Sequence, residues 1–190
     1  MGKMRILIGL LVALGLAIPA AAAKQEKVDV ERVLTGEPLG LLFNGVLSGQ
    51  YEIRKSDKNS LAFRGGIGGK SFGTDASYFS IMAGGMYRFW PMETAMQEWY
   101  WGPTANIFVM NIKVTNPFTG SDDSSTGFGL GMGAEGGYQY IFPSGLTLDG
   151  AIGLQLVFGS LSAGSGSYEV TIPMSGFYPY LRAAIGYAWK

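Results

Sequence analysis

Near its end the chain reads Tyr180-Leu-Arg-Ala-Ala-Ile-Gly-Tyr-Ala-Trp189, and this stretch decides the fold. Every second residue is apolar, whereas most of the residues between them are small or polar. Successive side chains of a β-strand point to opposite faces, so the alternation predicts a strand with one apolar face. That face would hold Leu181, Ala183, Ile185, Tyr187 and Trp189.

Similar alternating runs fill the chain upstream, and turn signals separate them. Asn44-Gly45 between apolar flanks favours a β-hairpin, and a polar turn is expected at 56–59. Pro38 suits the end of a strand, and a change of phase at Met110 suggests a bulge in the fifth strand. We expect eight strands, at roughly 33–43, 46–55, 60–72, 78–90, 99–114, 126–142, 146–161 and 177–189. Eight is an even number, as in closed bacterial barrels.

The polarity of the two faces distinguishes a membrane barrel from a soluble one. One face carries large apolar side chains, and the other carries glycine, serine and charges. Small residues suit the narrow interior of an eight-stranded barrel, and large apolar residues suit lipid. The sequence therefore predicts an all-β protein, an eight-stranded antiparallel up-and-down transmembrane β-barrel. The alternative is a soluble secreted β-barrel whose apolar face encloses a small ligand.

Charged residues on the inward face are expected to form a structural network inside the barrel. A buried charge must be paired, because removal of its partner leaves it uncompensated. Counting residues around the turn at Asp57 places Glu52 opposite Arg64, and a similar count places Arg88 opposite Ala62. The inward set comprises Glu52, Arg54, Arg64, Lys70, Arg88, Glu135, Asp149 and Arg182.

Aromatic residues gather at the strand ends that share a side with the C-terminus. Tryptophan and tyrosine favour the level of the lipid headgroups. With the C-terminus and the short turns in the periplasm, a periplasmic aromatic girdle is expected. Its members would be Trp90, Trp99, Trp101, Tyr187 and Trp189. The longer connections at 116–125 and 162–176 would then be loops exposed at the cell surface.

The first residues have the pattern of an export signal. Lys3 and Arg5 precede the uncharged apolar run Ile6–Ile18, and Ala21-Ala-Ala23 offers a cleavage site. This pattern is typical of a secretory signal peptide. We expect residues 1–23 to be cleaved and residues 24–190 to form a single barrel domain.

Composition excludes several classes of function. The chain of 190 residues holds no His and no Cys. Catalysis by His, thiol nucleophiles and Cys/His zinc sites are therefore absent, and we expect no enzyme activity, cofactor or metal. Glu135 and Asp149 could form an acid pair, but inward carboxylates beside arginines are more often structural. With 14 basic and 14 acidic residues, no basic excess favours nucleic acid.

The chain also resembles a known group of proteins. Its last strand resembles the C-terminal signal of outer-membrane barrels, and Pro38–Phe43, Gln50–Glu52 and Ser56–Lys58 resemble uncharacterised barrel proteins of diderm bacteria. The architecture is similar to small barrels of the OmpA and OmpX type. The resemblance implies location in the bacterial outer membrane, in contact with lipid and lipopolysaccharide. It also implies export by the Sec translocon, cleavage by signal peptidase, escort by periplasmic chaperones and insertion by the barrel-assembly machinery.

Two functions remain open at this point. The first is a monomeric, non-enzymatic scaffold that presents surface loops for envelope integrity, adhesion or binding. The second is a narrow transport channel for small molecules. Eight strands leave little open lumen, which favours the scaffold.

Overall fold

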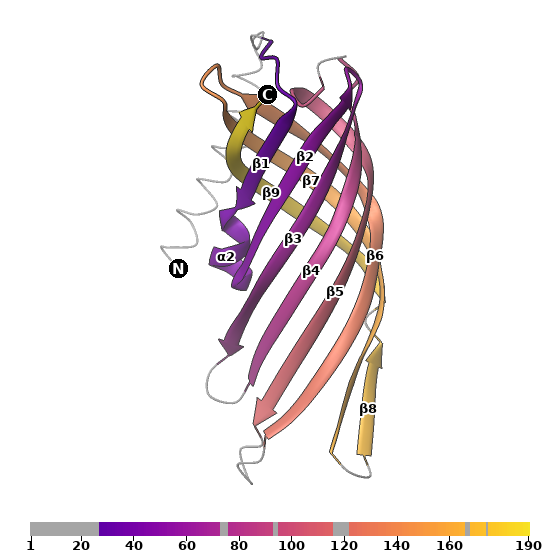
Figure 1. Ribbon diagram of the computed structural model, residues 1–190. Helices are drawn as coiled ribbons and strands as arrows, with labels where there is room; N and C mark the ends of the chain where they lie inside the picture. Colours follow the sequence, from indigo (N-terminus) through magenta and orange to yellow (C-terminus); the bar gives the residue numbers. More distant parts are fainter. Residues whose placement is uncertain (1–26, 73–75, 93–94, 116–121, 166–167, 174) are drawn as a thin grey trace, which may run out of the picture.

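The computed structural model describes residues 27–72, 76–92, 95–115, 122–165, 168–173 and 175–190 (Figure 1). The expected signal peptide lies outside these residues. The strands are β1 (Arg32–Glu37), β2 (Val46–Ser56), β3 (Asn59–Phe72), β4 (Ala76–Phe89), β5 (Glu98–Thr115), β6 (Asp122–Ile141), β7 (Leu146–Ser165), β8 (Tyr168–Pro173) and β9 (Gly176–Trp189). One short helix, α2 (Pro38–Asn44), interrupts this order in the described part of the chain.

The strands close into one antiparallel barrel. Each strand from β1 to β7 pairs with the next, β7 pairs with β9, and β9 pairs with β1. Ser160 of β7 pairs with Pro173 of β8, and Val157 pairs with Gly176 of β9. The register is therefore continuous, and β8 and β9 act as one interrupted strand. The predicted eight-stranded, all-β antiparallel barrel is confirmed.

The first predicted strand is wrong in its second half, where the chain forms α2. Pro38 occupies the first turn of this helix, a position in which its missing N–H costs nothing. Gly45 follows in the left-handed conformation, with φ 66° and ψ 20°, and caps the helix end. Asn44-Gly45 therefore ends a helix rather than forming a hairpin turn. No helix in the described part of the chain is long and apolar enough to cross a membrane.

Three further expectations about the strands are corrected. The region 162–176, expected as a loop, continues β7 and returns as β8. The β5–β6 register is uninterrupted, so β5 has no bulge against β6. Met110 and Ile112 therefore lie on the inner face of the barrel, like the other even-numbered residues of β5. The irregularity lies in β2 instead, between Arg54 and Ser56. This shift changes the register of every pair that was counted from the Asp57 turn.

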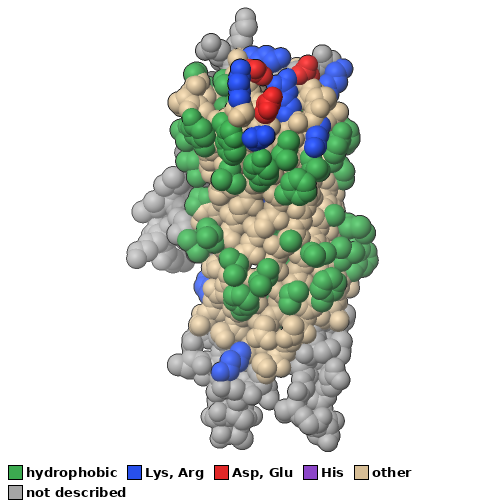
Figure 2. Space-filling model, viewed as in Figure 1, with side chains coloured by type: hydrophobic (Ala, Val, Ile, Leu, Met, Phe, Trp, Pro, Cys, Tyr) green, Lys and Arg blue, Asp and Glu red, His purple; other side chains and the backbone are tan. Residues whose placement is uncertain are grey.

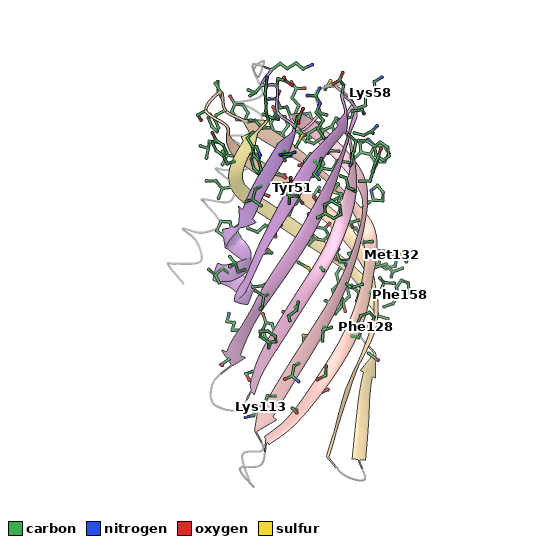
Figure 3. The ribbon with its side chains drawn as sticks, viewed as in Figure 1. Tyr51, Lys58, Lys113, Phe128, Met132 and Phe158 are labelled. Atoms are coloured by element: carbon green, nitrogen blue, oxygen red, sulfur yellow. The ribbon has the colours of Figure 1, made fainter. Side chains whose placement is uncertain are left out.

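The barrel is apolar outside and polar inside. Large hydrophobic side chains are exposed along the wall, including Ile67, Ile81, Ile152, Leu154 and Leu181. Figure 2 shows hydrophobic side chains gathered in belts across the visible face of the molecule, and Figure 3 shows Met132 and Phe158 pointing away from the wall. Polar side chains such as Gln50, Glu52 and Arg88 are buried. This polarity is the reverse of the soluble, ligand-enclosing alternative.

The connection between β4 and β5 covers one end of the interior. Trp90, Ala95, Met96 and Gln97 are buried there with Val30. The indole nitrogen of Trp90 donates to Ser60 Oγ at 2.8 Å, and Gln139 Nε2 donates to the Met96 carbonyl at 2.7 Å. We call this the C-terminal end, because Trp189 lies there; the opposite end, with the β5–β6 and β7–β8 connections, is the hairpin end (Figure 1).

Candidate functional site

Charged side chains meet inside the barrel, toward its C-terminal end, and Arg88 of β4 is central among them. Its Nη1 lies 2.7 Å from Glu52 Oε2, and its Nη2 lies 3.0 Å from Asp149 Oδ2. All three side chains are fully buried. Arg182 of β9 adds a second contact to Asp149, at 2.7 Å. Each of these four side chains points into the barrel from a different strand.

A second set of contacts joins this centre to β3 and β6. Arg64 Nη2 lies 3.0 Å from Glu135 Oε2, and Arg182 Nη2 lies 3.2 Å from Glu135 Oε1. Glu135 also approaches Arg88, at 3.8 Å. Three arginines are thus matched by three buried carboxylates, Glu52, Glu135 and Asp149. We call these six side chains the interior network.

Glycines on the inner face make room for the large side chains that cross the lumen. A Cβ at Gly153 would meet the ring of Tyr180, and one at Gly129 would meet the ring of Phe108. Small residues opposite large ones are how narrow barrels fill their interiors. This packing explains why glycine recurs on the inner face of β6.

Two tyrosines that the sequence reasoning did not single out belong to the network. Tyr100 donates to Asp149 Oδ1 at 2.7 Å, and its hydroxyl oxygen accepts from Arg182 at 2.6 Å. The Arg88 guanidinium also lies over the Tyr100 ring, 4.0 Å from its centroid. Tyr180 donates to Glu135 at 3.0 Å. Alternation with outward Trp99 and Trp101 could have identified Tyr100 as an inward residue.

The predicted cross-strand pairs are wrong. Glu52 lies opposite Ala62, whereas Gln50 lies opposite Arg64. Arg88 lies opposite Ser60 rather than Ala62. Because of this register Arg88, and not Arg64, contacts Glu52, and Arg64 bonds to Gln50 and Glu135 instead.

Two inward residues of the predicted set lie apart from the centre. Arg54 contacts Asp29 at 2.9 Å and also contacts Asp57, both at the C-terminal end. The hydrogen bonds from Lys190 and Arg54 keep the pKa of Asp29 below its ordinary value, with Lys190 contributing most. Lys70 is exposed near the hairpin-end terminus of β3.

Four of the five expected girdle residues have the exposure expected of a surface belt. Trp99 and Trp101 are 54% and 56% exposed, Tyr187 is also exposed, and Trp189 is partly exposed. Trp90 does not belong to this belt, since it is only 1% exposed. The chain turns inward directly after β4, and the Trp90 amide donates to the Lys58 carbonyl at 2.8 Å.

The interior network is suited to closing the barrel. Every carboxylate of the network has an arginine partner. Among the residues that the structure describes, no group of acidic side chains could hold a metal ion. The network and the rings of Tyr100 and Tyr180 make contacts across the lumen.

Two solved structures are similar to this chain. CarO2 of Acinetobacter baumannii has 11% sequence identity and a TM-score of 0.44, over 87% of this chain and 100% of that chain. A major outer membrane protein from Thermus thermophilus has 14% identity and a TM-score of 0.49, over 84% of this chain and 98% of that chain.

Sequence comparisons give two further findings. No curated protein matches the chain. A family model matches residues 41–169, which is more than half of the chain. The chain therefore belongs to the family described as "Protein of unknown function (DUF3575)".

Proposed function

We propose that the protein is a non-enzymatic β-barrel of the bacterial outer membrane, which acts as a closed scaffold for the connections at its hairpin end. One observation carries the proposal: the wall is apolar outside, and the charges are paired inside. A soluble barrel with this polarity would expose its apolar wall to water, whereas lipid solvates such a wall. Envelope integrity, adhesion or binding would then depend on the exposed connections.

The lengths of the strands support a barrel in which one part extends beyond the bilayer. A tilted strand of about 9–11 residues crosses the hydrocarbon core. β5 has 18 residues, and β6 and β7 have 20 residues each. The surplus lies toward the hairpin end (Figure 1). There it would hold the β5–β6 and β7–β8 connections clear of the headgroups, where a binding partner could reach them.

Aromatic and charged side chains support an orientation with the C-terminal end in the periplasm. Figure 2 shows charged side chains gathered at that end, next to a hydrophobic belt. Trp99, Trp101 and Tyr187 are exposed in the belt, at the level that the headgroups would occupy. We further propose that the monomer reaches the membrane through the Sec translocon, signal peptidase, periplasmic chaperones and the barrel-assembly machinery.

A closed interior favours the scaffold over a narrow transport channel. The interior network spans the lumen from β2 and β4 to β7 and β9. Trp90 and Met96 fill the C-terminal end. A solute that crossed along the axis would have to displace both layers, and separating buried ion pairs costs several kcal/mol by rough estimate.

Two measurements test the proposal. In the membrane fraction, unboiled protein is expected to migrate differently from boiled protein on a gel, because the folded barrel resists detergent. In planar bilayers, the refolded protein is expected to give no steady conductance. Identical migration with and without boiling would contradict a membrane barrel, and a large steady conductance would contradict the closed interior.

A further inference from the structure

The wall of the barrel is incomplete beside β9, in the half toward the hairpin end. β1 pairs with β9 only from Arg32 to Gly36. From Gly176 to Ala184, β9 pairs with β7 alone among the described strands. Helix α2 follows β1 and packs against β2, β3 and β9 (Figure 1). A helix bonds its own backbone, so α2 stands beside this part of β9 without pairing with it, and we call this place the gap.

The backbone of β9 shows which of its residues turn toward the gap. The Glu31 amide donates to the Trp189 carbonyl at 3.0 Å, and the Ala188 amide donates to the Gly145 carbonyl at 2.8 Å. Neighbouring residues of an antiparallel strand direct their polar backbone groups to opposite sides, so the odd-numbered residues of β9 face β1 or the gap. Pro179 is one of them, and proline is typical of a strand edge that stays unpaired. This residue argues against the addition of another strand in the gap.

An apolar patch on the inner face lies across the lumen from the gap. In the closed order of the strands β5 stands four places from β1, so its hairpin half faces the place where β1 is missing. Phe108, Met110 and Ile112 belong to the inner face there, and Met82 of β4 pairs with Phe108. All four side chains are partly exposed, although the interiors of such barrels are usually polar. We call these four side chains the apolar lining.

The lining and the edge of β9 require different chemistry from a ligand. The lining offers apolar contacts, which suit a hydrocarbon chain. At the edge, Phe177 presents an N–H and a carbonyl to the gap, and Pro179 presents a carbonyl alone. Unpaired backbone groups are costly in hydrocarbon, so the ligand must also bring atoms that form hydrogen bonds. An amide both donates and accepts, whereas an ester only accepts, so an acyl chain in amide linkage matches both surfaces.

We propose that an amide-linked acyl chain of an outer-leaflet lipid, of the kind that lipopolysaccharide carries, enters the lumen sideways through the gap. Its hydrocarbon lies against the apolar lining, and its amide binds the backbone edge at Phe177. No covalent step is involved. The inference rests on the proposed location in the outer membrane and adds a lipid ligand to the scaffold. The interior network lies between this ligand and the C-terminal end, so the lumen stays closed along its axis.

The test places the photo-crosslinker p-benzoylphenylalanine at single positions of the full barrel in intact cells and identifies the adducts by mass spectrometry. At Phe108 we expect adducts with lipopolysaccharide, although this residue lies on the inner face. Ile107 is its outward neighbour and is 49% exposed, so lipid adducts are expected there from the membrane location alone. Trp90, buried at the closed C-terminal end, is expected to give no lipid adduct.

The outcomes separate the inference from the location on which it rests. Lipid adducts at Ile107 without lipopolysaccharide adducts at Phe108 would overturn the inference alone. Absence of lipid adducts at Ile107 would contradict the membrane location and the inference with it. A cross-link from Phe108 to residues of α2 would show that the helix covers the lining, and it would also overturn the inference. Heat-modified migration on a gel shows whether each variant is folded.

A second pair of variants tests the amide contact. Phe177→Pro removes the N–H that faces the gap and leaves the hydrogen bonds with β7 in place, whereas Phe177→Ala removes only the ring. Combined with the crosslinker at position 108, Phe177→Pro is expected to lose most of the lipopolysaccharide adduct, and Phe177→Ala is expected to keep it. Equal yields from the two folded variants would reject the amide contact and with it the proposed ligand.

Discussion

Arg88 of β4 contacts Glu52 of β2 across the intervening strand β3, with Nη1 2.7 Å from Oε2 and both side chains fully buried. The two residues come from alternate strands, so the curvature of the barrel brings them together over the inner face of β3. Arg88 also reaches Asp149 at 3.0 Å. It therefore links strands from both sides of the lumen.

This contact predicts strong coupling between Glu52 and Arg88. Removal of one partner leaves the other as an uncompensated buried charge, which destabilises by roughly 3–5 kcal/mol. Glu52→Gln and Arg88→Met should each be costly, and the double variant should cost clearly less than the sum. Urea unfolding of refolded protein in lipid vesicles measures all three free energies of unfolding.

The control for that cycle pairs Glu52 with Arg64. Arg64 bonds to Gln50 and Glu135 and not to Glu52. The effects of Glu52→Gln and Arg64→Met should therefore be closer to additive. A larger coupling for Glu52 with Arg64 than with Arg88 would show that the register of β2 and β3 is wrong.

Leu154 is predicted to face the hydrocarbon core. It is exposed on the outer face of β7, and arginine at the midplane of a barrel wall destabilises by roughly 2–4 kcal/mol. Leu154→Arg should reduce the free energy of unfolding in vesicles by such an amount, while Leu154→Ala should have a small effect. Unchanged folding of the arginine variant would exclude lipid contact at this position.

Local alternation was sufficient to predict most of the wall. Leu181, Ile185 and Tyr187 alternate with small or polar residues, and all three are exposed on the barrel surface. Alternation could not reveal α2, because Pro38–Asn44 is as apolar as a buried strand and the helix forms only where β1 stops. The six residues of β8 do alternate, but the run is short and follows a stretch rich in serine and glycine, which favoured a loop; the strand pairs with β7.

The network was predictable as a set of residues but not as a set of pairs. The alternation of inward and outward positions along each strand identified the inward charged residues. The structure brings together Glu52, Arg88, Glu135, Asp149 and Arg182. The pairs depend on register. The turn pairs Ser56 with Asn59 rather than with Ser60, and the irregularity between Arg54 and Ser56 adds a second step, so Glu52 lies opposite Ala62 and not Arg64. Trp90 was misplaced for a related reason, since alternation does not extend past the end of β4 into an inward turn.

The pKa of Asp29 is predicted to depend on Lys190. Nζ of Lys190 lies 3.0 Å from Asp29 Oδ2, and this contact is the main reason that the pKa is below its ordinary value. A lowered carboxyl pKa stabilises the fold above the pKa of the unfolded chain, near 3.8, and this contribution is lost as the pH falls through the folded pKa. In Lys190→Gln, NMR titration of the Asp29 carboxyl should show a higher pKa. Lys27→Gln should leave it nearly unchanged, and the reverse order would contradict the assignment.

Brominated lipids should separate Trp90 from the other tryptophans. Bromine on the acyl chains quenches tryptophans that contact lipid, and Trp99 and Trp101 are exposed on the wall. Trp90 is buried against Ser60 and Tyr100, so a variant that keeps only Trp90 should retain its fluorescence. Variants that keep only Trp99 or only Trp101 should be quenched. Strong quenching of Trp90 would place it on the lipid face after all.

The hairpin end is predicted to lie outside the cell. β5 runs from the C-terminal end to the hairpin end, and β6 returns, so the connection between them should face the medium if the C-terminus is periplasmic. An epitope inserted after Gly120 should be stained by antibody on intact cells. The matched insertion after Ser144 lies in the short turn between β6 and β7 and should be stained only once the outer membrane is permeabilised. If the Ser144 epitope were stained on intact cells and the Gly120 epitope were not, the barrel would be inserted the other way round, and the surface role of its hairpins would have to be abandoned.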